Sequence, residues 1–599
     1  MKAWQKALCF VATAAILAAG FRDAGADEIQ PQEKSAPKAS VSEQHWEGAL
    51  TVRPGVQARL VVHVRNDAHG KTTATLDSPD EGFEGFKLDP FTLDKSRLVF
   101  ELKATAAKYE GKLNAAGTEA VGTWSQRGHD LPLSFKQTKT PTPMPRIVGP
   151  EQIWEGKLSV GAGLSLRLVF HVGKTADGTL MARMDSPDQG AKGIKVDHVT
   201  FDKSTLTFEL KALRGKYEGK LNAEGTEAKG TWTQSGISLP LNLKKSDKAT
   251  ELRRPQTPKG PFPYKVVDVS YVNKQGNVTL AGTLTEPEGP RPFPALILIS
   301  GSGAQDRDET IFEHKPFLVL ADALSRRGVA VLRVDDRGVG GSTGSTAGST
   351  SDDFAGDVLA GINFLKQRSE IDAKHIGLLG HSEGGIIAPM VAARSTDVAF
   401  IVLLAGTGLS GEEILYLQGQ ATLKAVGADE KALKQQLDLQ KRLFEILKTE
   451  KDQKALEPKL HEAAKAVTDS LPEAERKALG NLDAIISSQL KMVQSPWFRY
   501  FLTYDPRPAL AKVHCPVLAL IGEKDRQVPP AENLSQIESA LKKAGNAQVT
   551  VKELAGLNHL FQTCKTGAPS EYAQIEETIA PSALAVITDW ICQQGRAER

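Results

Sequence analysis

The chain has little net charge. Its 599 residues include 74 lysines and arginines against 72 aspartates and glutamates, which leaves a formal charge of +2. This balance gives no electrostatic reason to expect nucleic acid or an acidic membrane surface as a partner. Cysteine is also scarce, at four residues, and no cysteines and histidines are spaced as in a zinc site. The sequence therefore predicts no metal ion and no cofactor.

Apolar runs long enough to cross a membrane are lacking at the N-terminus, because the stretch from Ala7 to Gly20 is too short. Lys2 and Lys6 precede this stretch, and residues 24–26 (Ala-Gly-Ala) follow it, which is typical of a secretory signal peptide. We expect residues 1–26 to be this signal and the mature chain to have no integral membrane segment. The expected location is outside the cytoplasm of a bacterium, either periplasmic or extracellular.

Removal of such a signal would leave three cysteines, Cys515, Cys564 and Cys592. An odd number leaves at least one of them unpaired within a single chain. Since an exported protein meets an oxidising environment, we hypothesise that Cys564 and Cys592 form a disulfide.

Two segments of the N-terminal half repeat each other at a distance of 108 residues. Trp46, Tyr109 and Trp124 recur as Trp154, Tyr217 and Trp232, and the surrounding residues align without a gap. Within each copy apolar and polar residues alternate in short runs between glycine, aspartate and proline turns, which predicts antiparallel strands and a small sandwich or barrel. We expect the tryptophans to be core residues rather than a sugar-binding surface.

Composition and these motifs divide the chain into a series of expected segments. The division is residues 27–44 linker, 45–137 first β-domain, 138–152 linker, 153–246 second β-domain, 247–262 linker, 263–406 with 513–599 an α/β core, and 407–512 a helical insertion. In the insertion Leu433, Leu437, Phe444 and Leu447 fall on one stripe, which indicates an amphipathic helix.

A candidate nucleophile lies in the pentapeptide 380–384 (Gly-His-Ser-Glu-Gly), between the apolar run 376–379 and the apolar residues 386–388. A sharp strand-to-helix turn needs small residues on both sides, because its backbone is strained. Such a turn would expose the hydroxyl of Ser382, which makes this serine the expected nucleophile.

The acid and the base of a serine triad follow from chain order, since in folds with this turn the acid and then the histidine come after the serine. The apolar run 516–521 predicts a buried parallel strand, and Asp525 comes just after it, with Glu523 as the competing carboxylate. His559 is the only histidine after Asp525. We expect Asp525 and His559 to be the acid and the base, and His375 and His381 to have structural roles.

The third requirement of acyl transfer is an oxyanion hole. One donor is expected to be the backbone N–H of Glu383, directly after the nucleophile. The second is expected in the loop after the strand 295–299, where small residues let the backbone approach a substrate. We assign it to Ser302, with Gly303 as the alternative.

These motifs together resemble a known family. The segments 301–309, 335–342 and 380–385 are similar to those of bacterial EstD-type carboxylesterases of the α/β-hydrolase superfamily, and the resemblance covers roughly residues 262–595. It implies an α/β hydrolase fold, with a mostly parallel sheet, flanking helices and a helical lid, preceded by the two small all-β domains. In that family the residues matching Ser382, Asp525 and His559 are catalytic.

The function predicted from these features is an exported serine carboxylesterase that acts on small acyl esters. Serine aminopeptidases share the same motifs, so hydrolysis of peptide amides is one alternative. A second alternative is that the main function lies in the two β-domains. They would form a module that binds envelope polysaccharide or a protein partner, with the hydrolase attached to it. The expected insertion at 407–512 would act as a lid that shapes and dries the acyl pocket.

Overall fold

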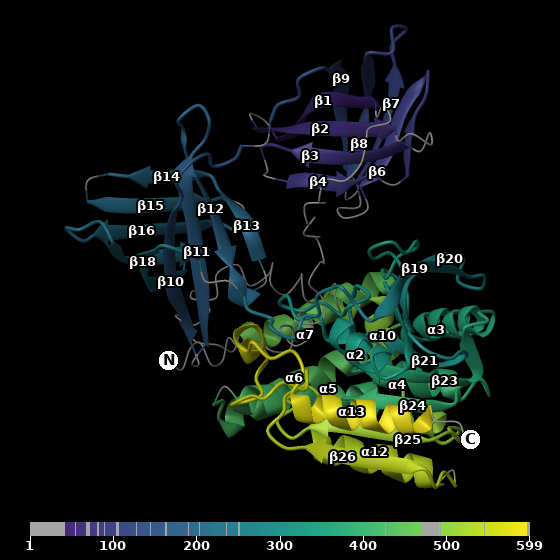
Figure 1. Cartoon of the computed structure of the whole chain (residues 1–599). Coiled ribbons are helices and arrows are strands. Elements are labelled where there is room, and N and C mark those ends of the chain that lie inside the picture. The colour runs from purple at the N-terminus through teal and green to yellow at the C-terminus, as the bar shows by residue number, and fades with distance from the viewer. Residues whose placement is uncertain are drawn as a thin grey trace.

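The computed structural model describes residues 42–595 apart from several gaps (Figure 1). The gaps are 54–55, 67–71, 81–82, 89, 103–106, 127–128, 144, 162–163, 190, 203, 212, 235–236, 250–251, 426, 470–489, 491–492 and 544. The expected signal peptide lies outside the described residues. Among the described helices, none is long and apolar enough to cross a membrane.

The first β-domain is a single antiparallel sheet. Its strands are β1 (Ser42–Arg53), β2 (Val56–Asn66), β3 (Thr72–Ser78), β4 (Phe83–Lys87), β5 (Phe91–Leu93), β6 (Arg97–Leu102), β7 (Ala107–Leu113), β8 (Glu119–Gln126) and β9 (His129–Thr138). Their order is β4-β3-β2-β1-β9-β8-β7-β6-β5. The two edge strands, β4 and β5, are consecutive in the chain and separated by only a few residues, so the sheet must curl until its edges approach.

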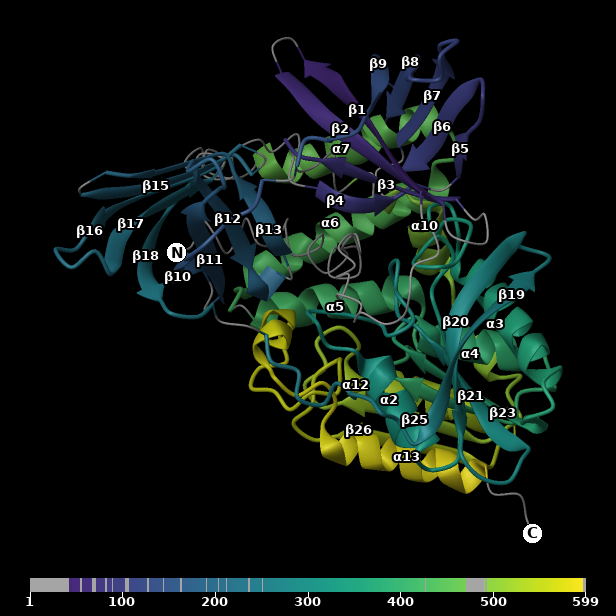
Figure 2. The same ribbon diagram turned by 45° about the horizontal axis from the view of Figure 1, so that its top comes forward.

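The second β-domain has the same strand order. Its strands are β10 (Gln152–Gly161), β11 (Leu164–Lys174), β12 (Leu180–Ser186), β13 (Ala191–Val196), β14 (His198–Phe201), β15 (Thr205–Leu210), β16 (Gly215–Leu221), β17 (Glu227–Gln234) and β18 (Ile237–Ser246), with the short helix η2 (Pro187–Gln189) after β12. The predicted all-β architecture is therefore confirmed for both domains. Figures 1 and 2 show them as two separate bodies beside the larger C-terminal unit.

Each curled sheet encloses its own apolar core. Alternate side chains of the strands point inward, and Trp46 and Trp154 are 1% exposed, while Tyr109 and Tyr217 are fully buried. The Tyr109 hydroxyl donates a hydrogen bond to the carbonyl of Ala120 at 3.0 Å, which satisfies its polar end inside the core. The repeated tryptophans are thus packing residues, as the sequence predicted, and the structure shows the same for the repeated tyrosines.

The C-terminal unit is built on an eight-stranded sheet. Its strands are β19 (Tyr264–Asn273), β20 (Val278–Pro287), β21 (Phe293–Ile299), β22 (Ala330–Val334), β23 (Ile371–His381), β24 (Phe400–Leu404), β25 (Val517–Gly522) and β26 (Val549–Leu554). They lie in the order β19-β20-β22-β21-β23-β24-β25-β26. The pairs β19–β20 and β20–β22 are antiparallel and the remaining pairs are parallel, which confirms the predicted mostly parallel sheet.

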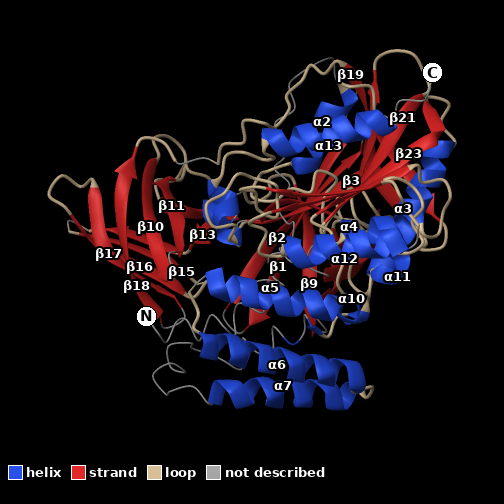
Figure 3. Ribbon diagram, turned by 90° about the horizontal axis from the view of Figure 1, so that it is seen from below, coloured by secondary structure: helices blue, strands red, loops and turns tan. Residues whose placement is uncertain are grey.

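Helices cover both faces of this sheet. They are α2 (Pro316–Ser325), α3 (Ser351–Lys366), α4 (Gly384–Ala392), α12 (Pro530–Lys543) and α13 (Pro581–Gln594), with η3 (Pro569–Gln574) before α13. Leu296 and Leu298 of β21 pack with α2 and α13, whereas Ile297 and Ile299 pack with α3 and α4 on the opposite face. Figure 3 shows the two helical layers on either side of the strands. Burial on both faces explains why the strands are continuous apolar runs.

The segment between β24 and β25 is helical, as expected. It contains α5 (Gly411–Ala425), α6 (Glu430–Thr449), α7 (Gln453–Asp469), α10 (Pro496–Thr503) and α11 (Arg507–Leu510). Helices α6 and α7 lie beyond α5, further from the sheet (Figure 3), and share a separate apolar core with α5 and α10. The predicted stripe on α6 is correct at Leu433, Phe444 and Leu447, but Leu437 is only partly buried and Leu439 is buried instead.

The hypothesised disulfide is wrong, because no disulfide joins Cys564 to Cys592. Cys592 belongs to α13 and packs in the core between that helix and the sheet. Cys564 lies in the loop after β26, where its Sγ donates to the carbonyl of Gly556 at 3.4 Å. The two thiols therefore belong to different environments.

The segment that joins the second β-domain to the C-terminal unit is anchored to the latter. The Arg254 guanidinium donates hydrogen bonds to the carbonyls of Phe312, Ala573 and Ile575, at 2.7 to 3.0 Å. Gln256 continues the anchor, because its side chain donates to the carbonyl of Ile579 and accepts from the N–H of Thr578. Close to this anchor, Lys192 of β13 forms an ion pair with Glu313 at 2.5 Å.

We expect Arg254→Ala to lower the free energy of unfolding of the C-terminal unit by about 2–4 kcal/mol, because three carbonyls lose a charged donor at a partly buried site. The neighbouring exposed residue provides the control. Arg253 makes only a long ion pair with Glu576, at 3.6 Å, so Arg253→Ala should cost less than about 0.5 kcal/mol. Urea unfolding followed by the helical circular dichroism signal measures both, and equal effects would contradict the anchor.

Candidate active site

Ser382 lies at a sharp turn between β23 and α4. Its φ angle is +54°, in the left-handed region that non-glycine residues rarely adopt. A Cβ atom at position 380 would come within 1.9 Å of the carbonyl oxygen of Gly384, and one at position 384 within 2.2 Å of the carbonyl oxygen of Ile299. Only glycine fits at these two positions, which is the physical reason for the Gly-x-Ser-x-Gly pattern.

The loops after β25 and β26 bring Asp525 and His559 together. The Nδ1 atom of His559 lies 2.8 Å from Oδ2 of Asp525, and both side chains are almost completely buried. The other carboxylate oxygen, Oδ1, accepts the backbone N–H groups of Gln527 and Val528, each at 2.8 Å. These bonds fix the carboxylate in one orientation behind the imidazole.

One cavity joins the expected site residues. Ser302, Ser382, Glu383 and His559 all line it, together with an apolar wall that includes Leu415, Trp497 and Phe501 from helices α5 and α10. Asp525 does not line the cavity and lies behind His559. Of the two candidates for the second oxyanion donor, Ser302 is among the lining residues and Gly303 is not. Glu523, the competing carboxylate, instead accepts the N–H of Gly556 at 2.7 Å.

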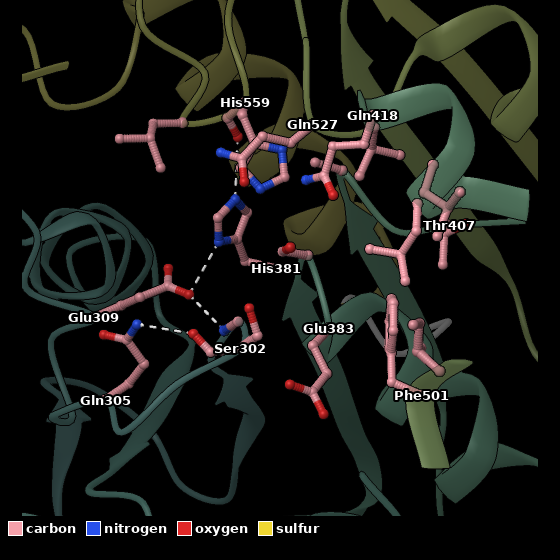
Figure 4. A pocket seen from close by; sticks show the side chains of 18 of the residues that line it. Ser302, Gln305, Glu309, His381, Glu383, Thr407, Gln418, Phe501, Gln527 and His559 are labelled. Carbon is pink, nitrogen blue, oxygen red and sulfur yellow. Dashed lines mark hydrogen bonds and ion pairs between the residues drawn. The ribbon is translucent and has the colours of Figure 1, made fainter. Parts of the chain in front are cut away.

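Sequence reasoning missed a buried acid–base pair beside Ser382. The Oε1 atom of Glu309 accepts the N–H of Gly301 at 2.7 Å and also lies 3.0 Å from Nδ1 of His381. The other ring nitrogen of His381 donates to the carbonyl of His559 at 3.1 Å. Figure 4 shows this chain of contacts, which links the oxyanion loop, the turn at Ser382 and the loop of His559.

The pair has a clear electrostatic consequence. Burial lowers the pKa of His381, but the charge of Glu309 and the hydrogen bond to it outweigh this effect and raise that pKa above its usual value. The only signal in the sequence was the histidine within the pentapeptide. The expectation for His381 was a structural role; its ring connects Glu309 to the carbonyl of His559 and also lines the cavity.

Two further carboxyl groups are buried near the site. Glu383 accepts hydrogen bonds from the hydroxyl of Ser351 and from the indole N–H of Trp497, at 2.5 and 2.8 Å, and burial raises its pKa. Asp336 accepts the hydroxyl of Ser300 at 2.8 Å and the N–H of Gln305 at 2.9 Å. Burial, only partly offset by these bonds, raises the pKa of Asp336 to about 8.

Asp336 should make the stability of the protein depend on pH. In the unfolded chain this carboxyl loses its proton near pH 4, whereas in the folded chain it keeps the proton up to about pH 8. The unfolded state therefore binds fewer protons between these values, and the wild type loses stability as pH rises, by at most about 1.4 kcal/mol per pH unit for this group. Asp336→Asn can keep both hydrogen bonds, with its oxygen facing Gln305 and its amide facing Ser300.

We expect the stability difference between Asp336→Asn and the wild type to shift in favour of the variant as pH rises from about 4 to about 8, and to stay constant above that range. Urea unfolding at several pH values measures it. Asp268→Asn is the control for the loss of one carboxylate at the surface, because the Asp268 side chain is 89% exposed. If the stability difference between Asp336→Asn and the wild type did not change between about pH 4 and about pH 8, Asp336 would not hold a proton in the folded protein.

Comparison with known proteins finds sequence similarity for the C-terminal unit. Residues 296–574 match the model of the alpha/beta hydrolase family. Esterase EstD of Thermotoga maritima is 26% identical over 283 residues, which are 47% of this chain and 58% of that esterase. The chain thus spans less than two thirds of the length of this curated relative.

Solved structures with similar folds include other esterases. An esterase of Pyrococcus furiosus is 15% identical, with 58% of this chain and 100% of its own chain covered and a TM-score of 0.35. Est1E of Butyrivibrio proteoclasticus is 16% identical, with coverages of 54% and 96% and a TM-score of 0.29. Scores of this size add nothing to what the strand order and the family match show. The C-terminal half of the chain is an α/β hydrolase domain that resembles bacterial EstD-type esterases.

Proposed function

We propose that the protein is a serine carboxylesterase that hydrolyses small acyl esters through Ser382, His559 and Asp525. The observation that carries this proposal is the contact of 2.8 Å between Nδ1 of His559 and Asp525, in a cavity that Ser382 also lines from a strained turn. A serine hydroxyl needs a base to become nucleophilic, and that base needs a carboxylate to fix its tautomer.

In the proposed reaction the Oγ atom of Ser382 attacks the ester carbonyl while Nε2 of His559 takes the hydroxyl proton. Asp525 holds Nδ1–H and stabilises the imidazolium that forms. The negative oxygen of the tetrahedral intermediate accepts the backbone N–H groups of Ser302 and Glu383. His559 then gives its proton to the leaving alcohol, and a water molecule, activated by the same histidine, hydrolyses the acyl-enzyme.

The helical segment between β24 and β25 acts in this proposal as a lid. Leu415 of α5 and Trp497 and Phe501 of α10 supply an apolar wall to the cavity, which suits an acyl chain. The indole N–H of Trp497 donates to Glu383, so the lid is tied to the residue directly after the nucleophile. We place the enzyme outside the cytoplasm, on the pattern of Lys2, Lys6 and the apolar stretch that follows them.

We expect Ser382→Ala to lower kcat for p-nitrophenyl acetate on the order of 10⁶-fold, by analogy with other serine triads. Ser302→Ala is the matched control, since it removes a hydroxyl from the same cavity but keeps the backbone N–H that serves as oxyanion donor. It should cost less than about tenfold, well below the loss for an absent donor. A folded Ser382→Ala protein with nearly wild-type turnover would falsify the proposal.

Ester hydrolysis is preferred over aminopeptidase activity for a structural reason. An aminopeptidase must hold the free amino group of its substrate, which calls for an available carboxylate in the cavity. Among the described residues, Glu309 and Glu383 are the carboxylates that line this cavity. Both are already engaged, Glu309 with Gly301 and His381, and Glu383 with Ser351 and Trp497.

For a panel of acyl p-nitrophenyl esters and aminoacyl p-nitroanilides, we expect kcat/KM to favour the esters by more than about 100-fold, because the wall accepts apolar acyl groups and no free acid binds an amine. Acylated amino-acid anilides serve as the control for amide reactivity. A preference for free aminoacyl anilides over their acylated counterparts would point to the peptidase instead.

A further inference from the structure

Two histidines face each other on the outer surface of the first β-domain. His45 of β1 and His63 of β2 are direct partners in the antiparallel register, and their Nδ1 atoms lie 2.9 Å apart. Glu43 precedes His45 by two residues and therefore points to the same face of the strand. The ligand atoms of Glu43, His45 and His63 all lie within 4.8 Å of one another.

A carboxylate on the next strand orients one of these imidazoles. The Oδ2 atom of Asp77 lies 2.9 Å from Nε2 of His63, and its Oδ1 accepts the N–H of Gly85 at 2.7 Å. The contact with Asp77 fits a His63 ring whose proton is on Nε2, so that Nδ1 presents a lone pair toward His45.

A carboxylate behind a histidine whose other nitrogen is free is the usual support of a metal ligand, because it fixes the tautomer and the ring orientation. Without a metal, His45 can donate its Nδ1–H to the lone pair of His63, which accounts for their contact. With a metal, both nitrogens can present lone pairs. β1, β2 and β3, which carry these groups, lie side by side in Figure 1.

We propose that Glu43, His45 and His63 bind a zinc ion, with a fourth position open to water. Two imidazoles and one carboxylate suit zinc, whereas calcium and magnesium prefer oxygen ligands. Nitrogens at zinc distance in a tetrahedron lie about 3.3 Å apart. The two rings need only separate by a few tenths of an ångström from their spacing of 2.9 Å.

Arg65 is the competitor for this site. Its Nε atom lies 2.9 Å from Oε1 of Glu43, and the two side chains are 66% and 36% exposed. Exposed ion pairs of this kind contribute little, so Glu43 can turn from Arg65 to a metal ion at small cost.

The second β-domain has the same arrangement of side chains, except that one of the three proposed ligands is missing. Glu151, His171 and Asp185 occupy the positions that match Glu43, His63 and Asp77, but Ile153 stands where the first domain has His45. There, Nε2 of His171 contacts Asp185 at 3.1 Å, and Nδ1 lies 3.4 Å from Glu151. A histidine between two carboxylates forms an ion pair instead of a site with two imidazoles, and the hydrogen bond to Asp185 is the main cause of its raised pKa.

This difference supplies matched variants for the test, which is zinc titration of the chelator-treated full chain by calorimetry. His45→Ile introduces the residue that the second domain carries, and we expect it to remove one equivalent of bound zinc and to weaken zinc binding at this site by at least about 100-fold. Ile153→His builds the missing ligand into the second domain and should add one equivalent. Asp77→Asn, which keeps all three ligands, should weaken binding by about 10- to 100-fold.

Thermal unfolding provides a second readout that does not depend on other metal-binding groups of the chain. Zinc should raise the unfolding midpoint of the wild type by a few degrees and have no such effect on His45→Ile. Circular dichroism and the midpoint without zinc check that each variant folds, and calcium in place of zinc should give no shift. Equal zinc binding and equal shifts in the wild type and His45→Ile, or no zinc binding by the wild type, would overturn the proposal.

Discussion

The bend of the backbone at Ser382 is the constraint around which the C-terminal unit is arranged. The turn is so tight that carbonyl oxygens of Gly384 and Ile299 occupy the space of two absent side chains. β23, which leads into the bend, lies between β21 and β24 in the sheet. Since parallel strands end at the same edge, the loops after β21 and β26 bring Ser302 and His559 to the same cavity, and the loop after β25 places Asp525 behind His559.

Four acidic side chains lie close together in this site, and each has a different set of partners. Asp525 contacts His559, Glu309 contacts His381, and Glu383 accepts from Ser351 and Trp497. Asp336 avoids a further negative charge by keeping its proton. Burial and hydrogen bonds thus give chemically similar groups different partners, so that Asp525 contacts His559 and Glu309 contacts His381, the two histidines that line the cavity.

The sequence predicted those features that depend on local geometry or on chain order. The pattern around Ser382 reflects steric crowding within five residues, and Asp525 and His559 follow from the order of strands along the chain. The α/β class and the two all-β domains followed from apolar runs and from alternation, and both are confirmed.

Contacts between distant segments could not be predicted in this way. Glu309 and His381 are 72 residues apart, and Arg254 bonds to carbonyls more than 300 residues later. His45 and His63 come together because they are paired in the register of β1 and β2. Their distance along the chain does not reveal this contact. The error at Cys564 and Cys592 has the same origin, because proximity to the C-terminus says nothing about which side of a helix faces the sheet.

The edge strands β4 and β5 affect whether two domains of such similar sequence can be adjacent in one chain without exchanging strands. A flat sheet would end in two strands with free N–H and C=O groups, and a neighbouring domain of nearly the same sequence would be well suited to pair with them. In the first domain the sheet curls so that its two margins come near each other, and these margins are short strands of five and three residues, which offer little free edge to a neighbour. Adjacent copies can therefore fold beside one another without exchanging strands.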